Sequence, residues 1–327
     1  MKALKSLFKA SIFSVLFILN INFMAYSSEL SNFKIAVMKF GTVLWELETI
    51  KNYELDKKHN FNLEIIKLAG NTATRVAFQA KEADAIVADW IWVAVQRNKG
   101  KDYVFSPYSK AIGELLVPKN SEIVSLKDLK GKTIGIAGGP LDKSWIIFQA
   151  YTKSKLGFDI KKSTNQIFGA PPLIFKKALS NEIDAVINYW HYIAKLKSRG
   201  MRSIISVADT ASELGLDKEN PMLGYVFDLS LPKSVSKMKK FISASNDAKI
   251  ILGNEKKSWE RIKPLMKVKS ESDFEGLING FRAGIPNAPI DVAGITKMFN
   301  LINQSGGSKL FGGIKELPKG LFVDEKK

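Results

Sequence analysis

Four tryptophans stand just after apolar, β-rich runs of this chain, at positions where their rings could bind a ligand. An indole ring can stack on a flat molecule or attract a cation, each contact being worth on the order of 1 kcal/mol. Packing inside a core is the alternative use of such a ring. Because the ends of strands border solvent rather than core, the repeated placement favours binding. The four residues are Trp45, Trp90, Trp145 and Trp190.

Polar residues stand at the same turns. The carboxylates of Glu46, Asp89 and Asp142 are suited to accept a ligand N–H or to pair with an ammonium, although Asp89 and Asp142 could instead cap helices. A predicted helix start at Asn71 and Thr72 offers hydroxyl and free amide groups that can hold an anion. The predicted ligand-binding set is therefore Trp45, Glu46, Asn71, Thr72, Asp89, Trp90, Gly139, Asp142, Trp145, Asn188, Tyr189 and Trp190.

Several catalytic chemistries are excluded or disfavoured by composition. The chain has no cysteine, which removes disulfides, thiol nucleophiles and thiolate metal sites. Its two histidines, His59 and His191, lie far apart in sequence, which argues against a histidine-rich metal site and a Ser-His-Asp triad. The glycine-rich segment 135–140 lacks the Lys-Ser/Thr pair of a phosphate loop. We therefore predict no enzyme activity, no cofactor and no metal.

From Phe33 onward, short β-rich runs alternate with amphipathic helical stretches, which predicts an α/β fold built from parallel βαβ units. The segment Glu82–Gly100 recurs as Glu182–Gly200 with six identical positions. A period near one hundred residues is too long for a solenoid, so it predicts two similar lobes. A ligand would bind in the cleft between them, at the carboxyl ends of the strands.

The predicted first lobe begins at 28–113, the second lobe is 114–224, and 225–327 returns to the first lobe before ending in helices and a tail. Gly113 and Gly224 lie in the two crossing strands. Each glycine either absorbs hinge motion or marks a strand bulge.

Residues 1–27 have the lysines, apolar run and small residues of a cleavable signal peptide. With no cysteine for a lipid, we expect a soluble periplasmic protein. The net charge of +17 comes mostly from lysines spread along the whole chain, with six arginines. That distribution indicates a solvated surface rather than a nucleic-acid site. We expect a monomer with no nucleic-acid partner.

Three segments resemble the periplasmic substrate-binding proteins of nitrate/sulfonate/taurine ABC importers, and the binders of thiamine-precursor pyrimidines share the pattern. They are "SEIVSLKDLKGKTIGIAGG" (121–139), "ALSNEIDAVINYW" (178–190) and "AFQAKEADAIVAD" (77–89). The resemblance implies a two-lobe periplasmic binding protein type II fold without catalysis. It also implies delivery of a small molecule to an inner-membrane ABC permease driven by its ATPase.

The sequence departs from the sulfonate binders after Gly138. Those relatives commonly place Ser or Thr where this chain has Gly139, Pro140 and Leu141. The ligand class therefore stays open among a sulfonate or taurine-like zwitterion, a pyrimidine-type heterocycle and a methylated amine, of which we prefer the first two. Two other functions also remain: a periplasmic enzyme that uses the same fold, and a ligand-sensing partner of a membrane receptor.

Overall fold

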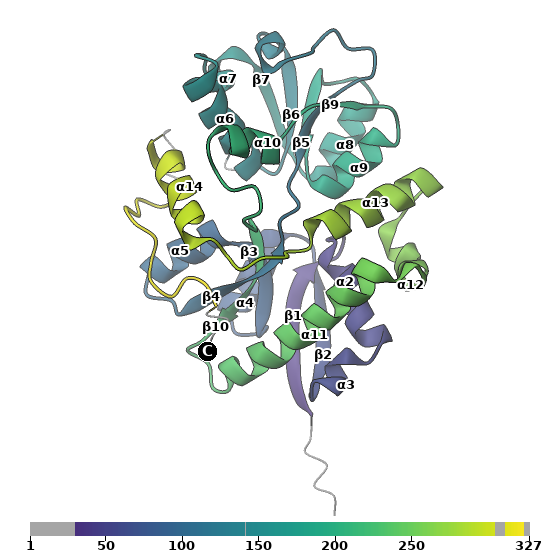
Figure 1. The fold of residues 1–327 in the computed structure, drawn as a ribbon, viewed down its shortest axis with the longest axis vertical. Coiled ribbons are helices and arrows are strands. Elements are labelled where there is room, and N and C mark those ends of the chain that lie inside the picture. The colour runs from purple at the N-terminus through teal and green to yellow at the C-terminus, as the bar shows by residue number, and fades with distance from the viewer. Residues whose placement is uncertain (1–29, 141, 305–310, 324–327) are drawn as a thin grey trace, which may run out of the picture. The chain divides into compact units, whose positions relative to one another are not determined.

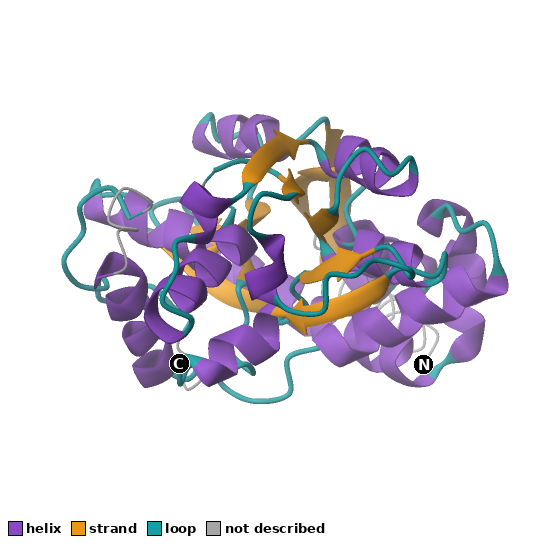
Figure 2. Cartoon of the chain, turned by 90° about the horizontal axis from the view of Figure 1, so that it is seen from above, coloured by secondary structure: helices purple, strands orange, loops and turns teal. Residues whose placement is uncertain are grey.

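The computed structural model describes residues 30–140, 142–304 and 311–323, and Figure 1 shows them as a ribbon. The predicted signal peptide, residues 1–27, lies outside the described residues. Within the described ranges no helix combines the length and apolar character needed to cross a lipid bilayer. The strands of these described ranges form two five-stranded sheets. Helices lie around the sheets, as Figure 2 shows from above.

The first sheet has the strand order β2-β1-β3-β10-β4. Its strands are β1 (Ser31–Met38), β2 (Phe61–Leu68), β3 (Ala85–Asp89), β4 (Tyr103–Ser109) and β10 (Leu223–Asp228). Strand β1 runs parallel to β3, whereas β10 runs antiparallel to both of its neighbours. Alternate residues of β1 enter opposite cores, because successive side chains of a strand point to opposite faces.

One face of this first sheet is covered by α2 (Val43–Asn52), α3 (Leu55–Lys58), α11 (Ser234–Asn254) and α12 (Lys256–Met266). The other face is covered by α4 (Asn71–Gln79), α5 (Trp90–Asn98) and α14 (Val292–Gln304). Both cores are closed by large apolar side chains from these helices, so the sheet is buried on both sides.

The second sheet has the strand order β7-β6-β8-β5-β9. Its strands are β5 (Glu114–Val117), β6 (Thr133–Ala137), β7 (Asn165–Gly169), β8 (Ala185–Asn188) and β9 (Arg202–Ser206). The 3₁₀ helix η2 (Leu126–Leu129) precedes β6. One face is covered by α6 (Lys143–Lys155), α7 (Ile160–Ser163) and α10 (Val207–Glu213). The other is covered by α8 (Pro171–Leu179) and α9 (Trp190–Lys197).

The aspartates of the sequence repeat have equivalent structural roles. The carboxylate of Asp84 accepts the amide N–H of Lys34 at 2.8 Å, and the Asp84 amide donates to the Lys34 carbonyl. Asp184 makes the same pair of bonds with Thr133, its carboxylate accepting at 2.7 Å. In each lobe the aspartate therefore fixes the start of one parallel strand against its neighbour. The repeat encodes this strand pairing as well as a helix after the strand.

The chain passes between the sheets twice, through residues 110–113 and 214–222. Both predicted hinge glycines lie where backbone approaches closely. A Cβ on Gly113 would stand 2.2 Å from the Asn188 carbonyl oxygen, and one on Gly224 would stand 2.4 Å from the Phe105 ring. The register between β10 and β4 shifts at Gly224, so this glycine also lies at a strand irregularity.

Helix α13 (Glu271–Gly284) connects the two lobes. Its apolar side, which includes Phe274 and Phe281, belongs to the core of the first lobe. Its other side lies along α9 of the second lobe (Figure 1). The two helices run antiparallel and contact each other through the residue pairs Trp190–Gly280, Ala194–Gly276 and Ser198–Asp273. The glycines allow this close approach because they have no side chain.

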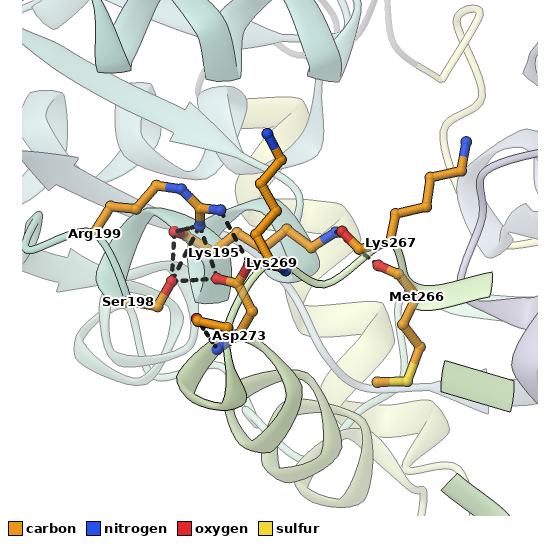
Figure 3. Close-up of polar contacts among 8 residues, drawn as sticks. Lys195, Ser198, Arg199, Met266, Lys267, Lys269 and Asp273 are labelled. Atoms are coloured by element: carbon orange, nitrogen blue, oxygen red, sulfur yellow. Dashed lines mark hydrogen bonds and ion pairs between the residues drawn. The ribbon is translucent and has the colours of Figure 1, made fainter. Parts of the chain in front are cut away.

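An ion pair closes the far end of this α9–α13 contact, as Figure 3 shows. The Arg199 guanidinium donates to both carboxylate oxygens of Asp273, at 2.8 and 3.0 Å. The Ser198 hydroxyl donates to the same carboxylate. Nearby, the Lys195 ammonium donates to the carbonyl of Met266 at 2.8 Å. Because α9 belongs to one lobe and α13 to the core of the other, these bonds join the lobes.

Candidate functional site

A cavity of about 160 Å³ lies between the lobes. The first lobe contributes the ends of β1 and β3, the start of α2, and α4. The second lobe contributes the starts of α6 and α9. This is where open α/β sheets bind ligands, since strand carboxyl ends and helix amino ends converge there. The polar and aromatic lining residues include Thr42, Asn71, Arg75, Asp89, Tyr108, Asp142, Lys143, Ser144, Tyr189, Trp190 and His191.

Asp89 is the centre of a charged cluster that spans both lobes. It ends β3 and caps α5, its carboxylate accepting the Trp92 amide at 2.9 Å. The same carboxylate lies 3.2 Å from the Arg75 guanidinium and 2.7 Å from the Lys143 ammonium of the second lobe. Burial alone would raise the pKa of Asp89, but Lys143 and Arg75 outweigh it and hold that pKa below its usual value. The two cations therefore share one ionised carboxylate.

Asp142 and Tyr189 supply the second polar group, from the other lobe. The Asp142 carboxylate caps α6 by accepting the Trp145 amide at 3.2 Å. Burial raises the pKa of Asp142 even though Lys143 lies beside it. Burial and the neighbouring carboxylate of Asp142 raise the pKa of Tyr189 to about 12. The phenol thus keeps its proton at neutral pH and is available as a donor.

His191 follows Trp190 in the first turn of α9. Neither of its ring nitrogens is exposed to solvent, and neither has a hydrogen-bond partner among the described residues. Burial, with a smaller effect of Lys195, lowers the pKa of His191 to about 3. The imidazole is therefore neutral at physiological pH, with one donor and one acceptor nitrogen.

Trp190 connects the cavity to the helix contact behind it. Its ring lines the cavity and meets the Trp45 ring edge-on, with centroids 5.8 Å apart. A Cβ on Gly280 would stand 2.6 Å from the same indole, so α13 lies directly against it. Trp190 of the second lobe therefore contacts the cavity and also two elements that pack in the first lobe, α2 and α13.

Five of the twelve residues predicted from the sequence line this cavity: Asn71, Asp89, Asp142, Tyr189 and Trp190. The indoles of Trp90 and Trp145 do not line it, which differs from the expectation for the four tryptophans. Both are fully buried, Trp90 against Phe311 in the first lobe and Trp145 in the core of the second. An indole in the first turn of a helix can face the cleft or fold under the helix, and the packing of each lobe decides which.

Trp45 and Glu46 lie behind the cavity wall rather than in it. The Glu46 side chain is wholly buried and accepts hydrogen bonds from Tyr225 at 2.5 Å and Ser245 at 2.6 Å. It also pairs with the Lys249 ammonium at 3.0 Å. These partners come from β10 and α11, so Glu46 fastens α2 to the core instead of facing a ligand.

The other predicted residues outside the cavity lining are Thr72, Gly139 and Asn188. Thr72 is exposed on α4. Asn188 is buried, donating to the Pro171 carbonyl at 3.1 Å and accepting the Tyr189 amide at 2.8 Å. It therefore shapes the turn that presents Tyr189.

Sequence reasoning missed Arg75, Tyr108, Lys143 and His191 as cavity residues. Lys143 and His191 each directly follow a residue that was predicted, and Arg75 lies one helical turn from Asn71. The sequence signal that could have found these three residues is their closeness to predicted residues, either next in sequence or one helical turn away. Tyr108 lies on β4, where the alternation of the strand gave no such indication.

Comparison with solved structures finds the same fold. The periplasmic aliphatic sulphonate-binding protein SsuA of Escherichia coli matches with a TM-score of 0.66 at 15% identity, over 88% of this chain and 95% of that one. An ABC transporter protein of Parabacteroides distasonis matches with a TM-score of 0.67 at 12% identity, over 90% and 99%. The two-lobe α/β fold predicted from the sequence is confirmed.

Sequence comparison adds the family. Among curated proteins, no sequence matches this chain. A family model described as "NMT1/THI5 like" matches residues 57–251, which include strands of both sheets, most of the cavity-lining residues and most of α11. Because that match covers more than half of the 327 residues of this chain, the chain belongs to the NMT1/THI5-like family.

Proposed function

We propose that this protein is the solute-binding component of an ABC importer and captures a small organic molecule between its two lobes. The observation that carries the proposal is the cavity, because both lobes supply its polar groups and one ion pair, Asp89–Lys143, crosses it. A ligand held by both lobes favours the closed arrangement by its differential affinity. The structural relatives named for sulphonate binding and for an ABC transporter support the same role.

The same role implies the rest of the transport path. Residues 1–27 direct export, the mature protein acts as a periplasmic monomer without a lipid anchor, and an inner-membrane permease with its ATPase receives the ligand. Catalysis is disfavoured by the cavity itself. Among the described residues, its one histidine has no hydrogen-bond partner, so it forms no nucleophile–base pair.

Of the two ligand classes, the cavity favours a pyrimidine-type heterocycle over a sulfonate or taurine-like zwitterion. A free cation would strengthen the binding of a sulfonate, yet Arg75 and Lys143 already share the Asp89 carboxylate. The lining also offers the flat rings of Trp190 and Tyr189. A planar heterocycle can stack on such rings while its ring nitrogens and amino groups bond Asp142.

Calorimetric titration of the mature protein tests this proposal. The ligands are 4-amino-2-methylpyrimidine, taurine and ethanesulfonate, followed by a thermal-shift screen of small metabolites. Binding to the folded state raises the melting temperature by mass action. The expected result is saturable binding of the aminopyrimidine in preference to both sulfonates.

Two tyrosines give a matched pair of variants. Tyr189→Phe removes a hydroxyl at the cavity and should weaken binding about tenfold, the value of one lost hydrogen bond. Tyr192→Phe removes the same group three residues later, outside the cavity lining, and should leave the affinity unchanged. If no small molecule binds, or if the two variants behave alike, the proposed site is wrong.

A further inference from the structure

His191 has an environment that the rest of the fold does not explain. Its two ring nitrogens are shielded from solvent and have no hydrogen-bond partner among the described residues. Its ring lies 4.6 Å from that of Tyr192 and 5.7 Å from that of Trp190, measured between centroids. These neighbours place aromatic carbon against the imidazole, which offers no hydrogen bond to its nitrogens.

A buried polar group without a partner is expensive, because it has lost its bonds to water and gained none in return. Native proteins satisfy the large majority of buried side-chain polar atoms, so an exception calls for an explanation. The chain contains a direct comparison. Its other histidine, His59, lies 2.8 Å from the Asp247 carboxylate and is satisfied in the ordinary way.

His191 is part of the lining of the cavity, so a molecule bound there lies beside its ring and can supply the partner that the described residues do not. We propose that His191 is a recognition residue whose ring nitrogen hydrogen-bonds an uncharged polar group of the ligand, such as an amide, a hydroxyl or a ring nitrogen. The inference rests on the proposed function, because it names the contact that selects the ligand at that same site.

The electrostatics explain why that ligand group is uncharged. Desolvation keeps the imidazole neutral, and Lys195 of the same helix opposes its protonation further. The other charged side chains of the cavity are Asp142 and Lys143 from α6, Asp89 from β3 and Arg75 from α4. An anionic group seated on His191 would gain most from the imidazolium form, which this setting disfavours, whereas an uncharged group can use the donor and the acceptor of the neutral ring.

The first test needs no ligand. Urea and thermal unfolding are compared for the mature protein, His191→Leu, His191→Gln and His59→Leu. Replacing the unsatisfied imidazole with leucine should raise the melting temperature, by about 2 °C or more if both nitrogens are unpaired. The same change at His59 should lower it, because a bond to Asp247 is lost. A lower melting temperature for His191→Leu would show that the nitrogens are satisfied and would overturn the inference.

The second test titrates the same proteins with 4-amino-2-methylpyrimidine and with taurine. We expect His191→Leu to weaken binding of the pyrimidine about tenfold and His191→Gln to retain part of the affinity. Unchanged affinity in His191→Leu, or tight taurine binding that depends on His191, contradicts the inference. If neither compound binds the unaltered protein, the proposed ligand class fails, and the unfolding comparison alone decides the role of His191.

Discussion

The stability of this protein should fall as the pH drops from 7.5 to 5.0, with His191 as a major cause. The folded pKa of this histidine is about 3, whereas an unfolded histidine titrates near 6.5. Below pH 6.5 the unfolded chain therefore binds a proton that the folded chain refuses. Stability is fully present above pH 6.5 and is lost progressively as the pH falls toward 3.

The expected size follows from the linkage relation. Each pH unit between the two pKa values costs about 1.4 kcal/mol for one proton. Between pH 7.5 and pH 5.0 the His191 contribution integrates to about 2 kcal/mol of lost unfolding free energy. For a two-lobe protein of marginal stability this is a large fraction of the total.

The assay is urea unfolding at pH 7.5 and pH 5.0, followed by tryptophan fluorescence, for the unaltered protein and His191→Leu. Other titrating groups of the cavity, including Asp142, whose raised pKa acts in the opposite direction, remain in both proteins and largely cancel in the comparison. The variant should lose about 2 kcal/mol less than the unaltered protein over this range. Equal losses in the two proteins would refute the reasoning, because they would mean that the folded state accepts the proton without penalty.

Three further predictions concern the contacts between the lobes. Asp273→Asn breaks the Arg199 ion pair at a carboxylate whose side chain is 1% exposed, so the unfolding free energy should fall by about 3 kcal/mol in a urea titration. Asp102→Asn breaks the Arg97 ion pair at a carboxylate whose side chain is 51% exposed, and should cost less than about 1 kcal/mol in the same titration. Gly280→Ala should lower the unfolding free energy by about 1–3 kcal/mol, because the new methyl carbon would lie 2.6 Å from the Trp190 ring. Gly253→Ala is the control: its methyl carbon would have no atom closer than 3.8 Å, and the change should stabilise α11 by up to about 1 kcal/mol. Lys143→Gln removes the cross-lobe partner of Asp89 and should lengthen the distance between fluorophores placed on the two lobes; an unchanged distance would show that this ion pair does not hold the lobes together.

Much of the fold was predictable because its signals are local. Strand and helix periods follow from side chains that alternate every two or 3.6 residues, and the repeat of Glu82–Gly100 at Glu182–Gly200 indicated two sibling lobes. The repeated aspartate has the same structural role in both lobes, because the carboxylates of Asp84 and Asp184 each accept a backbone N–H from the neighbouring strand.

The site was less predictable because equivalent sequence positions acquired different surroundings. Trp90 and Trp190 occupy the same place in the repeat, yet Trp90 is sealed in the first lobe and Trp190 faces the cavity. The difference comes from α13, whose Gly280 receives the Trp190 ring from ninety residues away. No period or motif in the sequence contains that contact.

The sequence by itself determined the order of strands and helices, the twofold construction and the family, because these depend on local periodicity and on matching segments. Only the tertiary structure decided which indoles reach the cavity, that Asp89 is shared by Arg75 and Lys143, and that the His191 nitrogens have no hydrogen-bond partner in the described part of the chain. Those outcomes depend on which side chains of distant segments meet, and on how burial shifts their charge. Such meetings are fixed by packing in three dimensions and not by spacing along the chain.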